Sequence, residues 1–310
     1  MADANRVSLI YVPETVFGTT PANSAAWKHL QFTGETLEPT YGTAEDQTIR
    51  DDRMSDGVIQ TSGTAAGEVD CTLRAGALDD FLEAVTGGTW TTNVLKVGTV
   101  QRSFSIEKKF ADLASGNKFE IMKGASVNKL DLSIQWGAIS TAKVGFMGAS
   151  WSDSATSAVG TGSVLVLPVK HAYNGSLDIT NVKVDGVAST LYFKQLTLSL
   201  MANLQNKTAI GDVFPYGFTY GHVGVQATAQ AYFDNRSLET KVRSGAPFAM
   251  EFTISDGTDS YDILIPNAYF TSRSGLNASK RDGDVVTTVN FSGAADATTG
   301  TSIQITRVIT

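Results

Sequence analysis

Side chains that could build a catalytic or metal site are few and scattered in this sequence. His29, His171 and His222 stand far apart, whereas a metal site usually needs clustered ligands. The single cysteine, Cys71, alternates with apolar neighbours in "GEVDCTL", which is typical of a buried strand, and no histidine lies near it in sequence. The pattern therefore predicts no nucleophile, no metal centre and no disulfide.

Two aspartate-glycine stretches, residues 255–262 ("SDGTDSYD") and 280–285 ("KRDGDV"), faintly resemble calcium loops. Neither has the D-x-[DN]-x-[DN]-G spacing with its closing glutamate, and Asp-Gly is the ordinary signal of a hairpin turn. No glycine-rich phosphate loop and no G-x-S-x-G elbow is present. We therefore expect turns at both stretches, no cofactor and no enzymatic activity.

The charge balance argues against a protein that grips DNA. The chain of 310 residues has a formal net charge of −7, with 31 acidic and 24 basic side chains. Phosphate binding depends on lysine and arginine, so an acidic chain suits a surface that surrounds DNA without holding it. Residues 1–155 carry 19 acidic against 13 basic side chains, and residues 156–310 carry 12 against 11. Almost all of the excess therefore lies in the first half.

Elements able to position these residues are mostly strands. Alternating apolar residues mark three clear examples, "NKLDLSIQW", "LTLSLMANL" and "GVQATAQAYF", which predict half-buried antiparallel strands. Helical spacing appears in "ALDDFLEAV", ended by Gly87 and Gly88, and more weakly in "NRSLETKV". No apolar run reaches the length of about 20 residues that crosses a bilayer, and the first residues lack a signal-peptide pattern. We expect a mainly β protein that is neither exported nor membrane-bound.

The two halves of the chain repeat one order of elements. A stretch rich in small polar residues, 152–163, reads as a linker or exposed loop between them. Each half has a long hairpin, a short helix, a strand, a tight turn and further strands. The closing strands match as "FMGA" at Phe146 and "FSGA" at Phe291. This predicts two tandem domains, residues 1–155 and 156–310, each with one short flanking helix.

A long polar segment, residues 41–68, lies between two predicted strands and contains Arg50, Asp51, Asp52 and Arg53. A long loop inside a compact domain is usually functional or disordered, so we expect an arm that lies on a neighbouring subunit, or else a solvated hairpin end. Its counterpart, residues 205–221, is aromatic instead. There Phe214, Tyr216 and Phe218 suggest either a buried contact with another subunit or a local cluster. Together with Arg50, Asp51, Asp52 and Arg53, they are the candidate contacts between subunits in these two segments.

Several stretches together resemble the tail tube (major tail) proteins of long-tailed, siphovirus-type bacteriophages. They are "RVSLIYVPETVFGTTPA", "LQFTGETL", "IRDDR", "GEVDCTLRAGALDDFLEAV", "FSIEKKFAD", and, late in the chain, "ILIPNAYF" and "FSGAAD". The resemblance covers almost the whole chain. It implies a β-sandwich or β-barrel-like fold whose copies form rings, with the rings stacked into a hollow tube for genome ejection.

The resemblance also gives the opening segment, residues 11–22, a role. The resemblance implies an extended segment that lies along the tube wall, and not a strand of the core. Pro13 and Pro21 keep the segment extended, and Phe17 offers one apolar anchor for a pocket in another subunit or on its own domain. Because many tail tube proteins are single-domain and form rings of six, a duplicated chain is expected to form trimeric, pseudo-hexameric rings.

The partners implied are other copies of the chain, a tape-measure protein, tail terminator and distal tail proteins, and double-stranded DNA that passes without specific binding. The expected location is the virion tail, assembled in the host bacterial cytoplasm. One alternative is a secreted or surface β-sandwich carbohydrate-binding module, which is also rich in strands, threonine, glycine and aromatics. A secretion-system tube protein is a further alternative, although such chains are typically about half this length as single domains.

Overall fold

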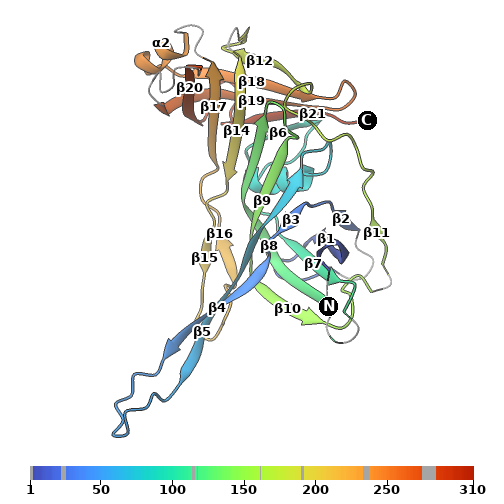
Figure 1. The fold of residues 1–310 in the computed structure, drawn as a ribbon, viewed down its shortest axis with the longest axis vertical. Coiled ribbons are helices and arrows are strands. Elements are labelled where there is room, and N and C mark those ends of the chain that lie inside the picture. The colour runs from blue at the N-terminus through green and yellow to red at the C-terminus, as the bar shows by residue number, and fades with distance from the viewer. Residues whose placement is uncertain are drawn as a thin grey trace.

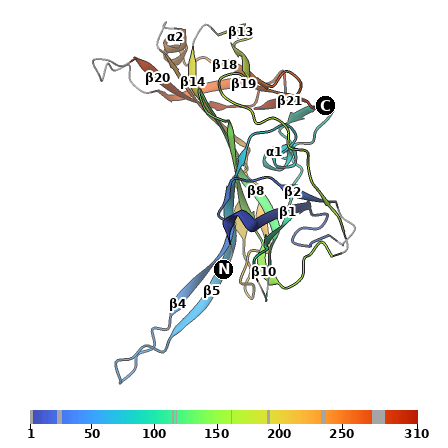
Figure 2. The same cartoon turned by 45° about the vertical axis from the view of Figure 1, so that its right-hand side comes forward.

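The computed structural model describes residues 3–21, 26–113, 116, 118–160, 162–189, 192–232, 237–273 and 284–310. It is mainly β with two short helices, which confirms the predicted fold class. The two views in Figure 1 and Figure 2 show an elongated molecule with a hairpin, β4–β5, extending from one end. The division into two tandem domains stays a prediction.

One continuous antiparallel sheet, here called the central sheet, runs through both halves of the chain. Its strands alternate buried and more accessible residues because one face covers the core. In β9, for example, Ala142, Val144 and Phe146 are buried, and the residues between them are not. A short strand, β3 (Gly34–Glu35), extends the sheet beside β5. In spatial order its strands are β4 (Glu38–Glu45), β5 (Val58–Thr72), β9 (Thr141–Gly148), β8 (Phe119–Gln135), β14 (Phe193–Met201), β17 (Gly224–Tyr232), β20 (Val286–Gly293) and β19 (Ser260–Arg273).

Two flank sheets pack against the core face of the central sheet. The first contains, in order, β11 (Val164–Leu165), β2 (Trp27–Leu30), β1 (Val7–Pro13), β7 (Phe104–Phe110), the start of β8, and β10 (Ser150–Ser154). The second contains β13 (Val187–Ala188), β12 (Ile179–Val184), β18 (Phe248–Ser255), the start of β19, β21 (Gln304–Val308) and β6 (Val94–Lys96). The remaining elements are η1 (Ala4–Arg6), α1 (Asp79–Thr86), α2 (Ser237–Ser244), and the hairpin β15 (Gln205–Lys207) and β16 (Gly217–Thr219).

The long strands β8 and β19 belong to two sheets each. The first part of β8 pairs with β7 and β10, and its last part pairs with β9 and β14. A bulge between Val127 and Lys129 marks the change of sheet. Likewise, β19 pairs first with β18 and β21 and then, from Ala268 onward, with β20. These bends let one strand form a corner of each sandwich.

The strand pairings of the two halves correspond one to one. In the first half the pairs are β4–β5, β5–β9, β9–β8, β8–β7, β7–β1 and β8–β10. In the second they are β14–β17, β17–β20, β20–β19, β19–β18, β18–β12 and β19–β21. All are antiparallel, and α1 and α2 follow β5 and β17 respectively. The order predicted from the sequence repeat thus has a counterpart in spatial pairing.

Aromatic rings occupy the centre of each sandwich. Phe81 of α1 is fully buried, and its ring centroid lies 4.8 Å from that of Tyr11, 5.3 Å from Phe104 and 5.4 Å from Phe146. Such tilted and edge-on pairs add to the burial term. In the second half Phe248 stacks on Phe270 at 4.4 Å and meets Phe291 edge-on at 5.5 Å. Phe146 and Phe291, matched in the sequence, hold equivalent places in the central sheet.

Helix α1 begins and ends close to the predicted bounds. Gly87 follows it with φ 63°, the left-handed conformation of a helix C-terminal glycine. Helix α2 is also present where the weaker pattern predicted it, although residues 233–236 lie outside the described chain. Likewise, the predicted turn after β18 is present, with Asp256 accepting hydrogen bonds from the backbone N–H of Thr258 and Asp259. Most of the second stretch, residues 280–285, is outside the described residues.

The expectation that the opening segment is no core strand is wrong for its first residues. Leu9, Tyr11 and Val12 are buried in β1, which pairs with both β2 and β7. In the sequence, the alternation of apolar and other residues spans only Leu9 to Tyr11 before Pro13 ends the strand. Such a short pattern is not enough to predict a buried strand. Only the residues after Pro13 leave the sheet.

Candidate assembly surfaces

The central sheet ends in two unpaired strand edges. Strand β4 pairs with β5 on one side, and within the described chain its other edge has no partner. Among the described residues, the last part of β19 pairs with β20 alone, since the pairing with β18 reaches only as far as Ala268. Open strand edges present free backbone N–H and C=O groups that can pair with another chain. Both ends of the sheet are therefore candidate contact surfaces.

The junction between the halves shows how such edges can meet. There β8 and β14 pair from Lys129 with Met201 to Gln135 with Gln195. In the correspondence described above, β14 is the counterpart of β4, and the end of β8 is the counterpart of the end of β19. The free edges of β4 and of the end of β19 therefore correspond to the two edges, of β14 and of the end of β8, that pair with each other inside the chain.

Further contacts hold this inner junction. Strand β6, from the first half, pairs with β21 of the second flank sheet. The carboxylate of Asp79 on α1 accepts a hydrogen bond from Tyr261 Oη at 2.5 Å and forms an ion pair with Arg307. The guanidinium of Arg307 lies over the Trp90 ring, 4.2 Å from its centroid. Burial raises the pKa of Asp79, and hydrogen bonding to Tyr261 and the charge of Arg307 oppose that rise.

On the face of the central sheet that points away from the core, the first half carries charges in ion pairs. Lys143 Nζ lies 3.1 Å from a carboxylate oxygen of Glu68 and 3.4 Å from one of Asp70. Lys129 Nζ lies 2.7 Å from Asp131. Asp131 and Asp70 are the cross-strand neighbours of Lys143, so these charges form one cluster. Hydrogen bonds to Glu68 and Asp70 raise the pKa of Lys143, which therefore stays protonated.

On the same face of β14, β17 and β20 the second half carries mostly neutral polar residues, such as Thr197, Gln226, Thr228 and Asn290, together with Met201 and Tyr232. Thr228 Oγ1 donates to Asn290 Oδ1 at 2.6 Å, and Asn290 Nδ2 donates to Ser272 Oγ at 2.8 Å. Neighbouring polar groups thus satisfy one another across the strands. The face is neutral in one half and charged but internally paired in the other.

The predicted arm is a hairpin rather than a loop. Strands β4 and β5 extend from the molecule, and residues 46–57 join them. Arg50 forms ion pairs with Asp52, at 2.6 Å, and with Asp56. The hydrogen bond from Arg50 lowers the pKa of Asp52. Asp51 and Arg53 have no charged partner among the described residues. The arm therefore has both paired and unpaired charges at its tip.

Apolar side chains are also exposed at this tip. Ile49 is 98% exposed, and Met54, Val58 and Ile59 are mostly exposed as well. A single exposed apolar residue is ordinary, but a group at the end of a protruding hairpin is typical of a contact site.

The aromatic segment of the second half contacts the first half within one chain. Phe218 is 4% exposed, and its ring meets that of Phe17 edge-on at 5.8 Å. Phe214 meets Tyr41 of the arm at 6.0 Å, and the nearby Gly63 N–H donates to the Val213 carbonyl at 2.7 Å. Of this group Tyr216 is largely exposed. The structure thus brings together Phe17 and Phe218; a role for any of these residues between subunits stays a prediction.

Sequence reasoning missed Glu14, which fixes the segment between Pro13 and Pro21. One carboxylate oxygen accepts hydrogen bonds from Ser105 Oγ at 2.7 Å and the Gly124 N–H at 2.9 Å. The other accepts from Ser103 Oγ at 2.6 Å and the Gly18 N–H at 2.8 Å. The signal available was a lone acid in a proline-bounded apolar stretch. These four hydrogen bonds to Glu14 hold the turn that contains Phe17 in place.

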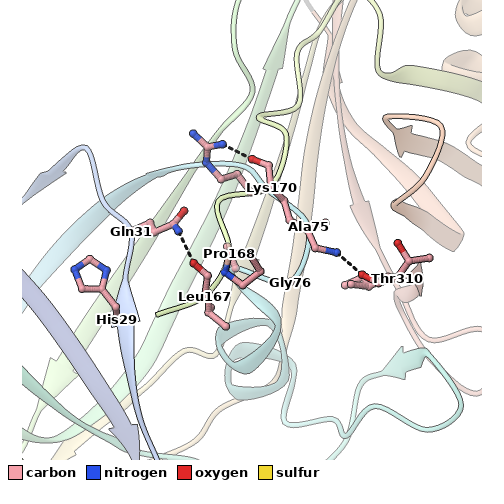
Figure 3. A pocket seen from close by; sticks show the side chains of 11 residues that line it. His29, Gln31, Ala75, Gly76, Leu167, Pro168, Lys170 and Thr310 are labelled. Atoms are coloured by element: carbon pink, nitrogen blue, oxygen red, sulfur yellow. Dashed lines mark hydrogen bonds between the residues drawn. The ribbon is translucent and has the colours of Figure 1, made fainter. Parts of the chain in front are cut away.

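A small cavity of about 200 Å³ lies where the segment between the halves crosses β2 and the chain's last residues, as Figure 3 shows. Three of its polar side chains already have partners within the chain. Gln31 Nε2 donates to the Leu167 carbonyl at 3.3 Å, Arg74 donates to the Lys170 carbonyl, and Lys170 Nζ donates to Thr310 O at 2.8 Å. These bonds tie the connecting segment down, and they leave few groups for a ligand.

The structure also shows the surroundings of Cys71 and His171. Cys71 is a buried free thiol of β5, and burial raises its pKa to about 12, far from a reactive thiolate. His171 Nε2 lies 3.0 Å from Asp178, and no group of metal-ligating side chains occurs among the residues with described positions. No helix in the described part of the chain is long and apolar enough to cross a membrane.

Open sheet edges, a protruding hairpin and a polar sheet face define a subunit suited to assembly with copies of itself. The family comparison agrees, because residues 4–305 match the model of the phage tail tube protein family. The chain therefore belongs to the phage tail tube protein family. A search of curated proteins finds no match. Family membership supports a structural role in the tail tube and a location in the virion tail, and it favours this reading over a carbohydrate-binding module or an enzyme.

Proposed function

We propose that three copies of this chain close into a ring, that rings stack into a hollow tube, and that the genome leaves the phage through its bore. The observation that carries the proposal is the pair of free edges on the central sheet. Strand β4 and the end of β19 are the counterparts of β14 and the end of β8, which pair antiparallel inside the chain. A second copy can repeat that junction.

The expected contact follows from the existing one. The free edge of β19 after Ala268 pairs antiparallel with the free edge of β4 in the next copy. Each chain then contributes eight strands to one closed sheet, four from each half. Closure removes both open edges, which otherwise would be sites of uncontrolled aggregation. Three chains give six similar wall units, so the ring is a pseudo-hexamer.

The face of the central sheet away from the core lines the bore in this proposal. Its cations at Lys129 and Lys143 are bound to acids of the same face, and β14, β17 and β20 add mostly neutral polar side chains. Binding of DNA phosphates by such a face requires breaking those ion pairs. Double-stranded DNA, and before it a tape-measure protein, can therefore pass without being held.

The arm and the opening segment form contacts between subunits. The arm reaches beyond the sheet that its own chain completes, so its residues Arg50, Asp51, Asp52 and Arg53 contact the next ring. Phe214 meets Tyr41 at the arm base, and Phe218 meets Phe17 of the opening segment. Together with Pro13, Pro21 and Tyr216, these aromatic residues form the proposed contact with a neighbouring subunit. Terminator and distal tail proteins cap the two ends of the tube, and assembly takes place in the host bacterial cytoplasm.

Mass measurement of one isolated ring, together with class averages viewed along the tube axis by cryo-electron microscopy, tests the proposal. The expected result is three chains, six similar densities around a hollow centre, and one continuous inner sheet. Six chains in a ring would overturn the trimer, and a monomer that never assembles would overturn the ring itself.

A further inference from the structure

A cleft opens at the junction between the halves, at the end of the molecule opposite the arm. Its volume is about 550 Å³, and the end of β8, the segment before β12, and the starts of β12 and β14 surround it. In both views α2 lies at one end of the molecule, with β12 labelled beside it in Figure 1 and β13 in Figure 2, and the arm tip lies at the other end. Trp136 and Tyr192 line the cleft and are 71% and 72% exposed.

The wall of this cleft is held by hydrogen bonds before anything binds. The Gly137 N–H donates to Ser176 Oγ at 2.9 Å, and the Gly175 N–H donates to the Ala138 carbonyl at 3.0 Å. A Cβ at Gly175 would lie 2.1 Å from the Gln135 carbonyl oxygen, so the two segments touch at the backbone. Two large exposed aromatic rings on a fixed wall are typical of a binding site, because little ordering is needed on association.

We propose that this cleft receives the arm tip of a second copy of the chain in the adjacent ring. The inference rests on the proposed tube and adds the receiving site. Arm and cleft lie at opposite ends, so their contact is head-to-tail and can continue without limit, as a tube requires. The described part of each chain has one arm of this length and one such cleft at its inner junction, so a ring of any size has as many arms as clefts.

Charge complementarity supports this occupant. Lys194 is the only charged residue lining the cleft, and its ammonium has no acidic partner among the described residues. The arm tip is acidic: residues 45–56 carry five acidic and two basic side chains, a net charge of −3. Asp51 is free of a charged partner within its own described chain, so it can meet Lys194 without breaking an ion pair.

Apolar complementarity supports it as well. Ile49 and Met54 are exposed at the arm tip, and no described part of their own chain covers them. Placed against Trp136 and Tyr192, they would remove four large side chains from water at once. The second-half hairpin β15–β16 is a poorer occupant, since its Val213 and Phe214 already contact the arm base.

Cross-linking tests the contact directly. The native Cys71 is buried, so a chain carrying both Ile49→Cys and Tyr192→Cys offers two new reactive thiols and little background. After assembly, a short bismaleimide reagent should join successive chains into a ladder of multiples of the 32.9 kDa chain on a denaturing gel. The control chains carry one cysteine each. Tubes that yield no ladder, or single-cysteine chains that yield the same ladder, would overturn the proposal.

A charge reversal gives a second, independent test. Lys194→Glu should shorten tubes seen by electron microscopy, and adding Asp51→Lys to it should restore their length. Lys207→Glu, an exposed lysine on β15 away from the cleft, is the matched control and should leave tube length unchanged. Normal tubes from Lys194→Glu, or no rescue in the double variant, would contradict docking in this cleft.

The two levels of inference fail differently. If the unaltered chain makes neither rings nor tubes, the proposed function is wrong. If it makes normal tubes and the cleft variants do too, only the docking site is wrong. Circular dichroism of each variant before assembly separates loss of stacking from loss of folding.

Discussion

The two halves of this molecule share a set of strand pairings but present different surfaces. Each half has the same six antiparallel pairs and a helix at the same place, yet the outward face of the central sheet is charged in one half and neutral in the other. The first hairpin projects, whereas β15–β16 folds back on its base. Alternating core residues therefore maintain the same pairing in both halves, while the surface residues differ.

The strongest way to break this comparison is to empty the same core position in each half. Phe146→Ala and Phe291→Ala should each destabilise the chain by about 3–5 kcal/mol, as expected for phenylalanine truncation in a core. Because β8 and β14 join the halves in one sheet, both variants should unfold in a single denaturant transition. Two separate transitions, with one half intact, would mean that the halves are independent domains.

Reversing the charges of the first arm tests whether only the projecting hairpin serves stacking. The double variant Arg50→Glu, Arg53→Glu should leave a folded chain that stacks poorly, because the Arg50 ion pairs with Asp52 and Asp56 that hold the tip are replaced by repulsion between carboxylates. Sedimentation at increasing protein concentration measures the loss. The same reversal on the other hairpin, Lys207→Glu, is the control. Equal loss in both would place the stacking contact elsewhere than in the arm.

Adding cations to the neutral half sharpens the difference between the two bore faces. Thr228→Lys with Asn290→Lys should give tubes that retain DNA, with affinity falling as salt rises by a slope of about 0.9 for each phosphate neutralised. Lys143→Gln, which frees Glu68 and Asp70, should bind no DNA at any salt concentration. If the lysine variant releases DNA as freely as the unaltered tube, this face does not line the bore.

The smallest expected effect concerns the glycines that follow the two helices. Gly87 and Gly245 have φ 63° and 64°, so alanine at either position costs about 1 kcal/mol of conformational strain. An added Cβ at Gly87 would lie 2.9 Å from the Gly98 carbonyl oxygen, while at Gly245 nothing lies within 4 Å. Gly87→Ala should therefore destabilise the chain more than Gly245→Ala in urea titrations. Equal losses would show that the steric contact relaxes.

Local signals predicted much of this fold. Alternation located strands such as β14 and β17, helical spacing followed by glycine located α1, and the match of Phe146 with Phe291 pointed to equivalent closing strands. These features depend on residues a few positions apart. The arm was harder, because β4 and the first part of β5 are exposed on both faces and carry no periodic apolar signal. Its hairpin character comes from pairing alone.

The contact surfaces were harder still to predict. The cleft brings together Trp136 and Tyr192 from segments more than fifty positions apart, and nothing in either segment specifies the other. Glu14 likewise serves groups near residues 103, 105 and 124. Pairings of β8 with β14 and of β6 with β21 depend on how the flank sheets pack against the central sheet. Single-sequence patterns describe the parts, and the surfaces arise from how those parts meet.

Strand β6 has a consequence for the order of assembly. It adds a second sheet connection across the junction inside the chain, whereas α2 ends at Ser244 and β18 begins at Phe248, which leaves the second half no room for an equivalent strand. In a trimeric ring, junctions within chains would thus be both covalent and doubly paired, and those between chains would have only the central-sheet contact. Joining the halves in one chain gives the inner junction a high effective concentration and spares the translational entropy of a separate encounter. Under tension the ring should open between chains first, so each chain would enter and leave the wall as an intact pair of units.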